Sequence, residues 1–249
     1  MPQAYDKAGR LLTVTSEGKT TEYAYYDNGS RKSVTYPNGA KEEYSYYKDG
    51  LNSTLANTKK DGTVIDSYIY TYDTAHNMKT KSDNKGLTVY TYDSLNRLLT
   101  VTEPSGRLTS YTYNKAGNRL SETVTSGTEA QTTTYTYNEQ NRLIKTITQN
   151  QNQTERVLYA YDSNGNITSK SKTVVKIKPS GSKASVTGSK SGDGADSTQS
   201  LYSYDVWNQM VKAAEGKTTS AYAYNAEGYR VQKTVNGQIT RYLYERRIR

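Results

Sequence analysis

The 249-residue chain is basic and poor in aliphatic side chains: its formal net charge is +9, it has no Phe and no Cys, and Leu, Val and Ile together number only 36. The absence of Cys excludes a disulfide framework, a thiolate metal site and a thiol nucleophile. Such a composition ordinarily indicates disorder, but 26 Tyr and abundant Thr favour pleated, half-buried strands. We therefore expect an ordered protein whose thin core is built largely of tyrosine rings.

A short tyrosine-rich unit recurs along the sequence. The last tyrosines of its copies are Tyr5, Tyr26, Tyr47, Tyr72, Tyr92, Tyr113, Tyr137, Tyr161, Tyr204, Tyr224 and Tyr244. Asp or Asn follows nine of these eleven residues. Alternation with a period of two places the tyrosines of one copy on one face of a strand. In eight copies Gly, Asn or His stands four residues after the last Tyr, where a hairpin turn needs positive φ. Each copy therefore predicts one β-hairpin.

The residues that we assign to this signature have a structural role in our interpretation. They are Tyr5, Asp6, Tyr70, Tyr72, Asp73, Tyr90, Tyr92, Asp93, Tyr111, Tyr113, Gly117, Tyr135, Tyr137, Tyr159, Tyr161, Asp162, Gly165, Tyr202, Tyr204, Asp205, Tyr222, Tyr224 and Gly228. Two early copies, at residues 23–27 and 44–48, carry one extra residue before the turn, for which a β-bulge is the simplest explanation.

The predicted fold is all-β, with antiparallel hairpin repeats that pair edge to edge into a curled strip, an open shell or a β-solenoid. Residues 1–178 form the first part of the strip and residues 201–249 continue it. Between them, residues 179–200 are rich in Gly and Ser and predict a flexible loop or linker. The basic run at residues 170–178 could bind a polyanion, although a solvated loop or a protected edge strand is the favoured interpretation.

The unit Tyr-x-Tyr-Asp-x-x-Gly-Arg-Leu resembles the signature of the YD-repeat, or RHS-repeat, family of bacterial wall-associated and polymorphic toxins, insecticidal toxin complexes and teneurins. The resemblance extends from Tyr5 to Tyr244. It implies a β-strip that spirals into a hollow shell, which encloses a C-terminal toxin domain in long members. It also implies an exported or cell-surface protein, and carbohydrate binding has been attributed to some members.

The sequence departs from full-length members of that family in two respects. It has no Asp-Pro dipeptide, which is part of the self-cleaving segment of some members, and it stops at residues 245–249 where a new turn should form. Its first residues do not have the pattern of a signal peptide and lie inside a repeat, so we expect the chain to derive from a longer protein. Self-cleavage and a carried toxin are accordingly not expected for this chain itself.

No catalytic, cofactor or metal site emerges from the residue pattern. The single His76 stands at a position where His tolerates positive φ, so a turn residue is favoured over a catalytic one. The recurring Asp residues are typical of turns, where they accept backbone hydrogen bonds. Residues 162–166 faintly resemble a calcium loop, but Thr173 stands where the loop needs Glu, and another turn is the better interpretation.

Two classes of function remain after these exclusions. The favoured one is a non-catalytic structural fragment of a secreted or cell-surface bacterial shell; the alternative is a module that binds carbohydrate or an anionic cell-wall polymer, with tyrosine rings stacking on sugars. No specific nucleic-acid motif and no membrane span are present in the sequence. The open ends of a strip expose unpaired backbone groups, which predicts self-association.

Overall fold

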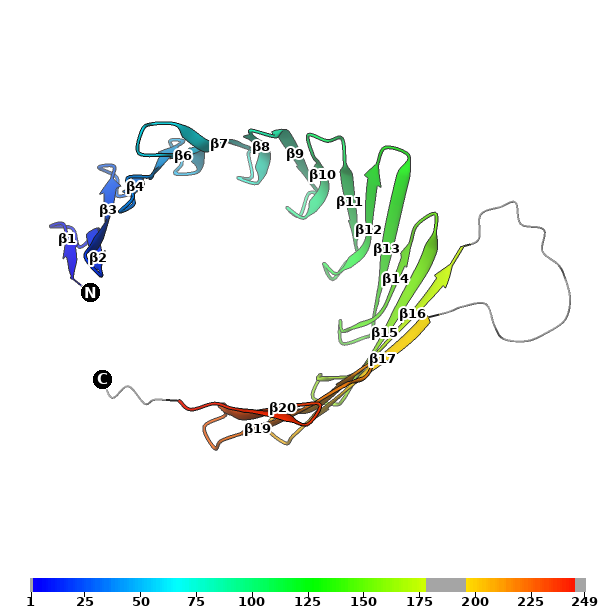
Figure 1. The fold of residues 1–249 in the computed structure, drawn as a ribbon. Coiled ribbons are helices and arrows are strands. Elements are labelled where there is room, and N and C mark those ends of the chain that lie inside the picture. The colour runs from blue at the N-terminus through cyan, green and yellow to red at the C-terminus, as the bar shows by residue number, and fades with distance from the viewer. Residues whose placement is uncertain (1, 178–195, 245–249) are drawn as a thin grey trace, which may run out of the picture. The chain divides into compact units, whose positions relative to one another are not determined.

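The computed structural model describes residues 2–177 and 196–244, and these residues contain strands and turns but no helix (Figure 1). The predicted all-β class is therefore confirmed for the described chain. Two compact units divide it, Met1–Ser110 and Tyr111–Arg249.

The first unit contains ten strands and the start of an eleventh. They are β1 (Gln3–Tyr5), β2 (Leu11–Ser16), β3 (Lys19–Tyr25), β4 (Arg31–Thr35), β5 (Lys41–Tyr46), β6 (Asn52–Thr58), β7 (Val64–Tyr72), β8 (Met78–Asp83), β9 (Gly86–Tyr92), β10 (Leu98–Thr102) and β11 (Leu108–Tyr113). The second unit contains the end of β11 and ten further strands. They are β12 (Arg119–Ser126), β13 (Glu129–Tyr137), β14 (Leu143–Gln149), β15 (Gln153–Tyr161), β16 (Ile167–Lys176), β17 (Asp196–Tyr204), β18 (Met210–Glu215), β19 (Thr218–Tyr224), β20 (Arg230–Val235) and β21 (Gln238–Arg241).

Every strand from β1 to β10, and every strand from β12 to β20, pairs antiparallel with the strand that follows it in the sequence. Close backbone contacts between strands are confined to such neighbours in the described residues, and nearly all side chains there are at least partly exposed to solvent. Each unit is thus a single-layer strip of hairpins, and its strands follow a curved path (Figure 1). Curvature is expected because neighbouring strands twist relative to one another.

The core is as thin as the composition predicts. Among the described residues, Val34 and Val157 are the only buried hydrophobic side chains, and no side chain is fully buried. The buried polar side chains are those of Ser33, Thr88 and Thr109. Because so little apolar area is removed from water, stability must depend heavily on the backbone ladder and on hydrogen bonds from side chains.

A β-bulge is present in many hairpins and not only in the two early copies where the sequence predicted it. In the hairpin β3–β4, for example, Ala24 pairs with Ser33 but Tyr25 pairs with Arg31. The same shift occurs next to the turn in nine further hairpins. The bulge therefore belongs to the turn that these hairpins share, and it does not arise from an extra residue.

Two segment predictions need correction. The basic run is neither a loop nor an edge, because up to Lys176 it belongs to β16, which pairs with β15 and β17. Alternating Thr and Val favour a strand there, and Lys172 Nζ reaches Glu155 Oε2 at 2.7 Å. Of the predicted linker, residues 179–195 lie outside the described residues. Its last five residues are strand, since β17 begins at Asp196 and not at Leu201.

Candidate functional site

The feature that recurs through the structure is a five-residue turn, which we call the YD turn and number from its first residue. In the first copy, Asp6 N–H donates to the Arg10 carbonyl at 2.9 Å and Gly9 N–H donates to the Asp6 carbonyl at 3.0 Å. This pattern is a type I turn followed by a bulge residue in the left-handed conformation. The same two bonds recur in the turns that begin at Tyr26, Tyr47, Asp73, Asp93, Asn114, Asn138, Asp162, Asp205 and Asn225.

The fourth residue of each YD turn has a positive φ, as the sequence predicted. Gly occupies this position in six copies, including Gly9, Gly117, Gly165 and Gly228. His76, Asn96, Asn141 and Asn208 occupy it in the other four, with φ between 58° and 65°. Asn and His are among the few residues that tolerate this conformation.

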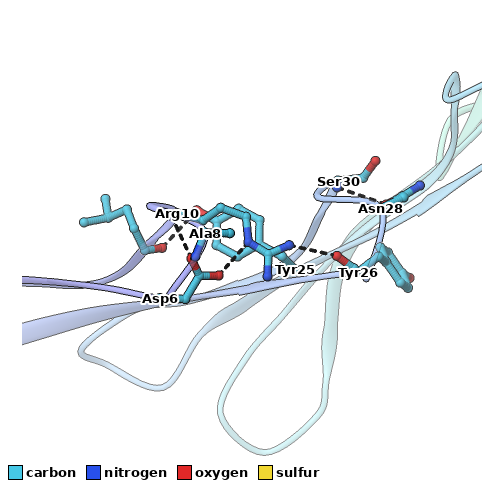
Figure 2. A network of polar contacts seen from close by, with 8 residues as sticks. Asp6, Ala8, Arg10, Tyr25, Tyr26, Asn28 and Ser30 are labelled. Atoms are coloured by element: carbon cyan, nitrogen blue, oxygen red, sulfur yellow. Dashed lines mark hydrogen bonds and ion pairs between the residues drawn. The ribbon is translucent and has the colours of Figure 1, made fainter.

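The first residue of the turn stabilises it through its side chain. Asp6 Oδ1 accepts the amides of Ala8 and Arg10, each at 2.9 Å, and Asp6 Oδ2 accepts Arg10 Nε at 2.6 Å (Figure 2). These bonds favour the ionised carboxylate: the Arg10 amide and then the Arg10 side chain lower the pKa of Asp6. The recurring carboxylates at the first turn position therefore accept hydrogen bonds from backbone amides of their own turns.

Equivalent bonds are present in the later turns. The Oδ1 atoms of Asp73, Asp93, Asn138, Asp205 and Asn225 each accept the amides of the third and fifth turn residues, and those of Asn114 and Asp162 accept the fifth. Hydrogen bonds from Asn77, Arg97 and Asn166 lower the pKa values of Asp73, Asp93 and Asp162, respectively.

The tyrosine that precedes a YD turn joins its hairpin to the preceding one. Tyr137 OH donates to the Arg119 carbonyl at 2.9 Å, beyond Ser121 and Thr134, where the β12–β13 ladder ends. The hydroxyl thus adds a hydrogen bond where strand pairing has stopped. Four more bonds follow the same rule, from Tyr25 to Leu11, Tyr92 to Met78, Tyr161 to Leu143 and Tyr224 to Met210. Tyr244 OH likewise donates to the Arg230 carbonyl.

Side chains at the end of one turn also reach the next turn. Asn118 Nδ2 donates to Asn141 Oδ1 at 2.7 Å, and Asn77 Nδ2 donates to Asn96 Oδ1 at 2.8 Å. Where Arg takes this place, it reaches backbone instead: Arg10 Nη1 donates to the Tyr26 carbonyl at 3.1 Å (Figure 2). Successive turns are therefore linked directly as well as through their strands.

Arginines near the turns lie against the tyrosine rings. The Arg119 guanidinium is 4.7 Å from the Tyr135 ring centroid and 5.5 Å from that of Tyr111. Arg230 lies in the same way over Tyr222 and Tyr242, at 5.5 and 5.2 Å. Each cation–π contact occupies a ring face that a ligand would otherwise stack on.

Two copies differ from the alignment that the sequence suggested. Tyr26 and Tyr47 are the first residues of their turns and take the place of Asp, so the preceding tyrosines end the strands. The capping oxygen has moved to the third turn residue: Asn28 Oδ1 accepts the Ser30 amide at 3.0 Å (Figure 2). An Asn or Asp two residues after such a tyrosine was the sequence signal for this variant.

The predicted signature residues occupy three places. The first tyrosine of each pair lies two residues before the end of an odd-numbered strand, and the second ends that strand. The first tyrosines are Tyr70, Tyr90, Tyr111, Tyr135, Tyr159, Tyr202 and Tyr222, and the second are Tyr72, Tyr92, Tyr113, Tyr137, Tyr161, Tyr204 and Tyr224. Tyr5 ends β1, and the Asp and Gly residues are the first and fourth turn residues described above. Burial raises the pKa values of several rings, among them Tyr135.

The two suspected chemical sites are both turns. His76 is exposed at a turn, and its Nε2 lies 3.6 Å from Asp49 Oδ2, a partner that the sequence did not predict. Asp162 caps its own turn, and Thr173 lies on β16 opposite Arg156. Among the described residues no group of three metal-ligating side chains comes together. The described part of the chain also contains no helix long and apolar enough to cross a membrane.

Comparison with known proteins finds the same repeat. A family model described as RHS Repeat matches residues 5–41 and 92–130. The tRNA nuclease WapA of Bacillus subtilis (strain 168) and the tRNA3(Ser)-specific nuclease WapA of Bacillus spizizenii are each 28% identical to this chain over 157 residues. The alignment covers 62% of this chain and 5% of each relative, so the chain spans only a small part of their length.

Two solved structures are also similar. The crystal structure of TcdB2-TccC3-Cdc42 matches 94% of this chain and 16% of its own chain, at 12% identity and a TM-score of 0.47. That of TcdB2-TccC3 without its hypervariable C-terminal region matches 95% and 16%, at 15% identity and a TM-score of 0.45. The repeated turn agrees with this comparison: two stretches of the chain, residues 5–41 and 92–130, match the RHS Repeat, also called the YD repeat.

Proposed function

We propose that the chain is a non-catalytic, structural stretch of an RHS shell in an exported or cell-surface protein. The observation that carries this proposal is the hydrogen bond from the tyrosine hydroxyl of one hairpin to a backbone carbonyl of the preceding hairpin, repeated along the strip. The signature carboxylates accept hydrogen bonds from backbone amides of their turns. This supports a structural role for the repeated residues, in the wall of such a shell. A single-layer curved strip is suited to such a wall.

The family relationship supports a more specific role. In long members, such a wall would enclose a C-terminal toxin domain, and we propose this role for the complete protein from which the stretch comes. Both WapA relatives are named as nucleases, and this chain aligns with only 5% of their length. The nuclease activity named for them belongs to those proteins, and we propose none for this stretch.

Protease protection of the complete protein tests the enclosure. The segment that follows the repeats should resist a protease that cleaves it rapidly once it is expressed alone. Substituting Tyr137, Tyr161 and Tyr224 with Phe removes three bonds between hairpins and should make the enclosed segment cleavable. Equal cleavage of the segment alone and in the intact protein would refute the enclosure.

The alternative function is binding of carbohydrate or a cell-wall polymer. Exposed aromatic side chains favour it, since Trp207 is 76% and Tyr229 is 52% exposed. Retention of the chain on insoluble wall material, and its release by soluble saccharide, would support this function. Release by salt alone would indicate attraction of the +9 chain to polyanions without saccharide recognition.

Self-association is a separate proposal about the isolated chain. The strand at the end of such a strip exposes backbone N–H and C=O groups. These groups could form hydrogen bonds with a strand of another copy and so stabilise an assembly. Sedimentation at rising protein concentration, in low and high salt, tests it. A single monomeric species throughout would contradict the proposal.

A further inference from the structure

Successive YD turns are joined through two residues, the fifth residue of one turn and the fourth residue of the next. Asn stands at both positions in three pairs of turns: Asn77 with Asn96, Asn118 with Asn141, and Asn166 with Asn208. In the last pair, Asn166 Nδ2 donates to Asn208 Oδ1 at 2.9 Å, although the two residues are 42 positions apart in the sequence. The pairing therefore follows the order of the turns and not a fixed spacing along the chain.

A second class of pair combines a long donor side chain with glycine. Its members are Arg10 with Gly29, Arg142 with Gly165, and Gln209 with Gly228. Arg142 Nη1 donates to the Asp162 carbonyl at 3.2 Å, and a Cβ atom on Gly165 would lie only 3.0 Å from Arg142 Nη2. A Cβ atom on Gly228 would lie 3.1 Å from Gln209 Nε2, whereas the space at Gly29 is open. In the two later pairs, the donor therefore occupies space that glycine leaves free.

A residue of one class cannot replace its counterpart in the other class without a loss of stability. An Asn side chain at Gly165 would enter the space that the Arg142 guanidinium uses. Conversely, Asn118 Nδ2 donates to Asn141 Oδ1 at 2.7 Å, and glycine has no such acceptor. A mixed pair therefore has either a steric conflict or an amide without this hydrogen bond, and both are destabilising.

The two classes alternate along the sequence from the turn at Asp73 to the turn at Asn225. The successive pairs are Asn77 with Asn96, Arg97 with Gly117, Asn118 with Asn141, Arg142 with Gly165, Asn166 with Asn208, and Gln209 with Gly228. If any hairpin among them were skipped, a fifth residue would meet the fourth residue of the next turn but one, and every such pair would be mixed. Earlier in the chain, Ser30 and Leu51 belong to neither class.

We propose that these matched pairs are specificity determinants: each pair selects the next hairpin in sequence order over the next but one. Selection is needed because the hairpins share one pattern of strands and tyrosines, and similar repeats are prone to pair out of order. The proposal is independent of the enclosure of a toxin, since any strip of such hairpins must keep them in order.

A double-mutant cycle in the full chain tests the matching. Asn118→Arg creates a mixed pair and should raise the equilibrium constant of unfolding about fivefold or more, the effect of one lost hydrogen bond. Asn141→Gly should be more favourable by a similar factor in the Asn118→Arg variant than in the wild type, because the combined variant recreates the class of Arg with Gly. The preference of glycine for positive φ is the same in both backgrounds and cancels. Urea denaturation measures each variant, and an equal effect of Asn141→Gly in both backgrounds would overturn the proposal.

Hydrogen exchange tests the selection of order. Gly165→Asn makes the pair with Arg142 mixed, and it gives Asn118 a matching residue if the hairpin of β13 and β14 is skipped. Exchange in β13 and β14 should therefore be faster in Gly165→Asn than in Gly165→Ala, which crowds Arg142 in the same way but offers no acceptor. Exchange in β12 should be alike in the two variants. Equal exchange of β13 and β14 in both variants would show that the pairs do not select the neighbour.

Discussion

At the scale of single residues, one oxygen and one hydroxyl explain why the repeat has its sequence. The side-chain oxygen of the first turn residue accepts turn amides, and the preceding tyrosine bonds to the hairpin before it. In the copy at Asn138, its Oδ1 accepts the amides of Gln140 and Arg142 at 3.1 and 2.9 Å, and Tyr137 OH reaches the Arg119 carbonyl. Asp and Asn are interchangeable here because each offers the same oxygen.

Replacing the capping oxygen should destabilise the protein measurably. Asn138→Ala should lower the free energy of unfolding by about 0.5–2 kcal/mol, the range of a lost side-chain cap. Asn138→Asp keeps the accepting oxygen and should remain close to the wild type. Urea denaturation of both variants provides the measurement, and an equal loss in the two would contradict the role of the oxygen.

The tyrosine hydroxyl should contribute separately from its ring. Tyr137→Phe retains the ring but leaves the Arg119 carbonyl without this donor, so we expect a loss of about 1 kcal/mol. The control is Tyr159→Phe, since the Tyr159 hydroxyl has no hydrogen-bond partner among the described residues. If both substitutions have the same effect on the unfolding midpoint in urea, the hydroxyl bond is not the cause.

At the scale of the elements, the sequence predicted hairpins well but missed how they are joined. Period-two alternation and the turn residues were sufficient to place the strands. The tyrosine–carbonyl bonds were not predictable, because backbone acceptors leave no signature in the sequence. The hydrogen bond between Asn118 and Asn141 did leave a signature in the sequence: when Asn is the fifth residue of one turn, Asn is also the fourth residue of the next turn. Positive φ alone had explained that second Asn, so the signal was missed.

The strand segments also show where composition misleads. The lysines of residues 170–176 suggested a loop or a protected edge strand, yet Thr and Val between them keep this segment in β16, which pairs with β15 and, up to Val174, also with β17. Tyr26 and Tyr47 suggested an inserted residue, although each replaces the Asp of its turn. In both cases backbone pairing overrides the side-chain pattern, since a strand that leaves the strip would lose its hydrogen bonds on both sides.

The half-buried tyrosines predict sensitivity to alkali. Burial, followed by the hydrogen bond to Glu42, raises the pKa of Tyr44 from 10.0 to about 12. A raised pKa in the folded state means that folding favours the protonated phenol. Its contribution is therefore complete below the unfolded pKa of 10.0 and is lost as the pH rises toward about 12. Tyr70, Tyr72 and Tyr92 shift in the same direction through burial.

Urea denaturation across this range measures the effect. The free energy of unfolding should be flat between about pH 8 and about pH 9 and fall between about pH 10 and about pH 12. Tyr44→Phe should reduce the slope of that fall. A constant free energy up to about pH 12 would show that these phenols titrate alike in the folded and unfolded chain.

At the scale of the whole molecule, the described strands contact only their neighbours in the sequence. Such a protein resembles a one-dimensional array, in which stability is the sum of hairpin terms and nearest-neighbour terms. The repeats made this architecture predictable from sequence. The groove that Trp207 and Tyr224 line was not predictable, because it depends on two turns lying side by side.

The central claim is that hydrogen bonds between successive hairpins hold the strip together locally. Hydrogen exchange of the Tyr137→Phe variant, compared with the wild type by mass spectrometry, tests this claim most directly. Exchange should accelerate in β12, β13 and β14, next to the lost bond, and stay unchanged in β3, β4 and β5. Acceleration spread equally over both sets of strands, or none in β12 and β13, would contradict the account.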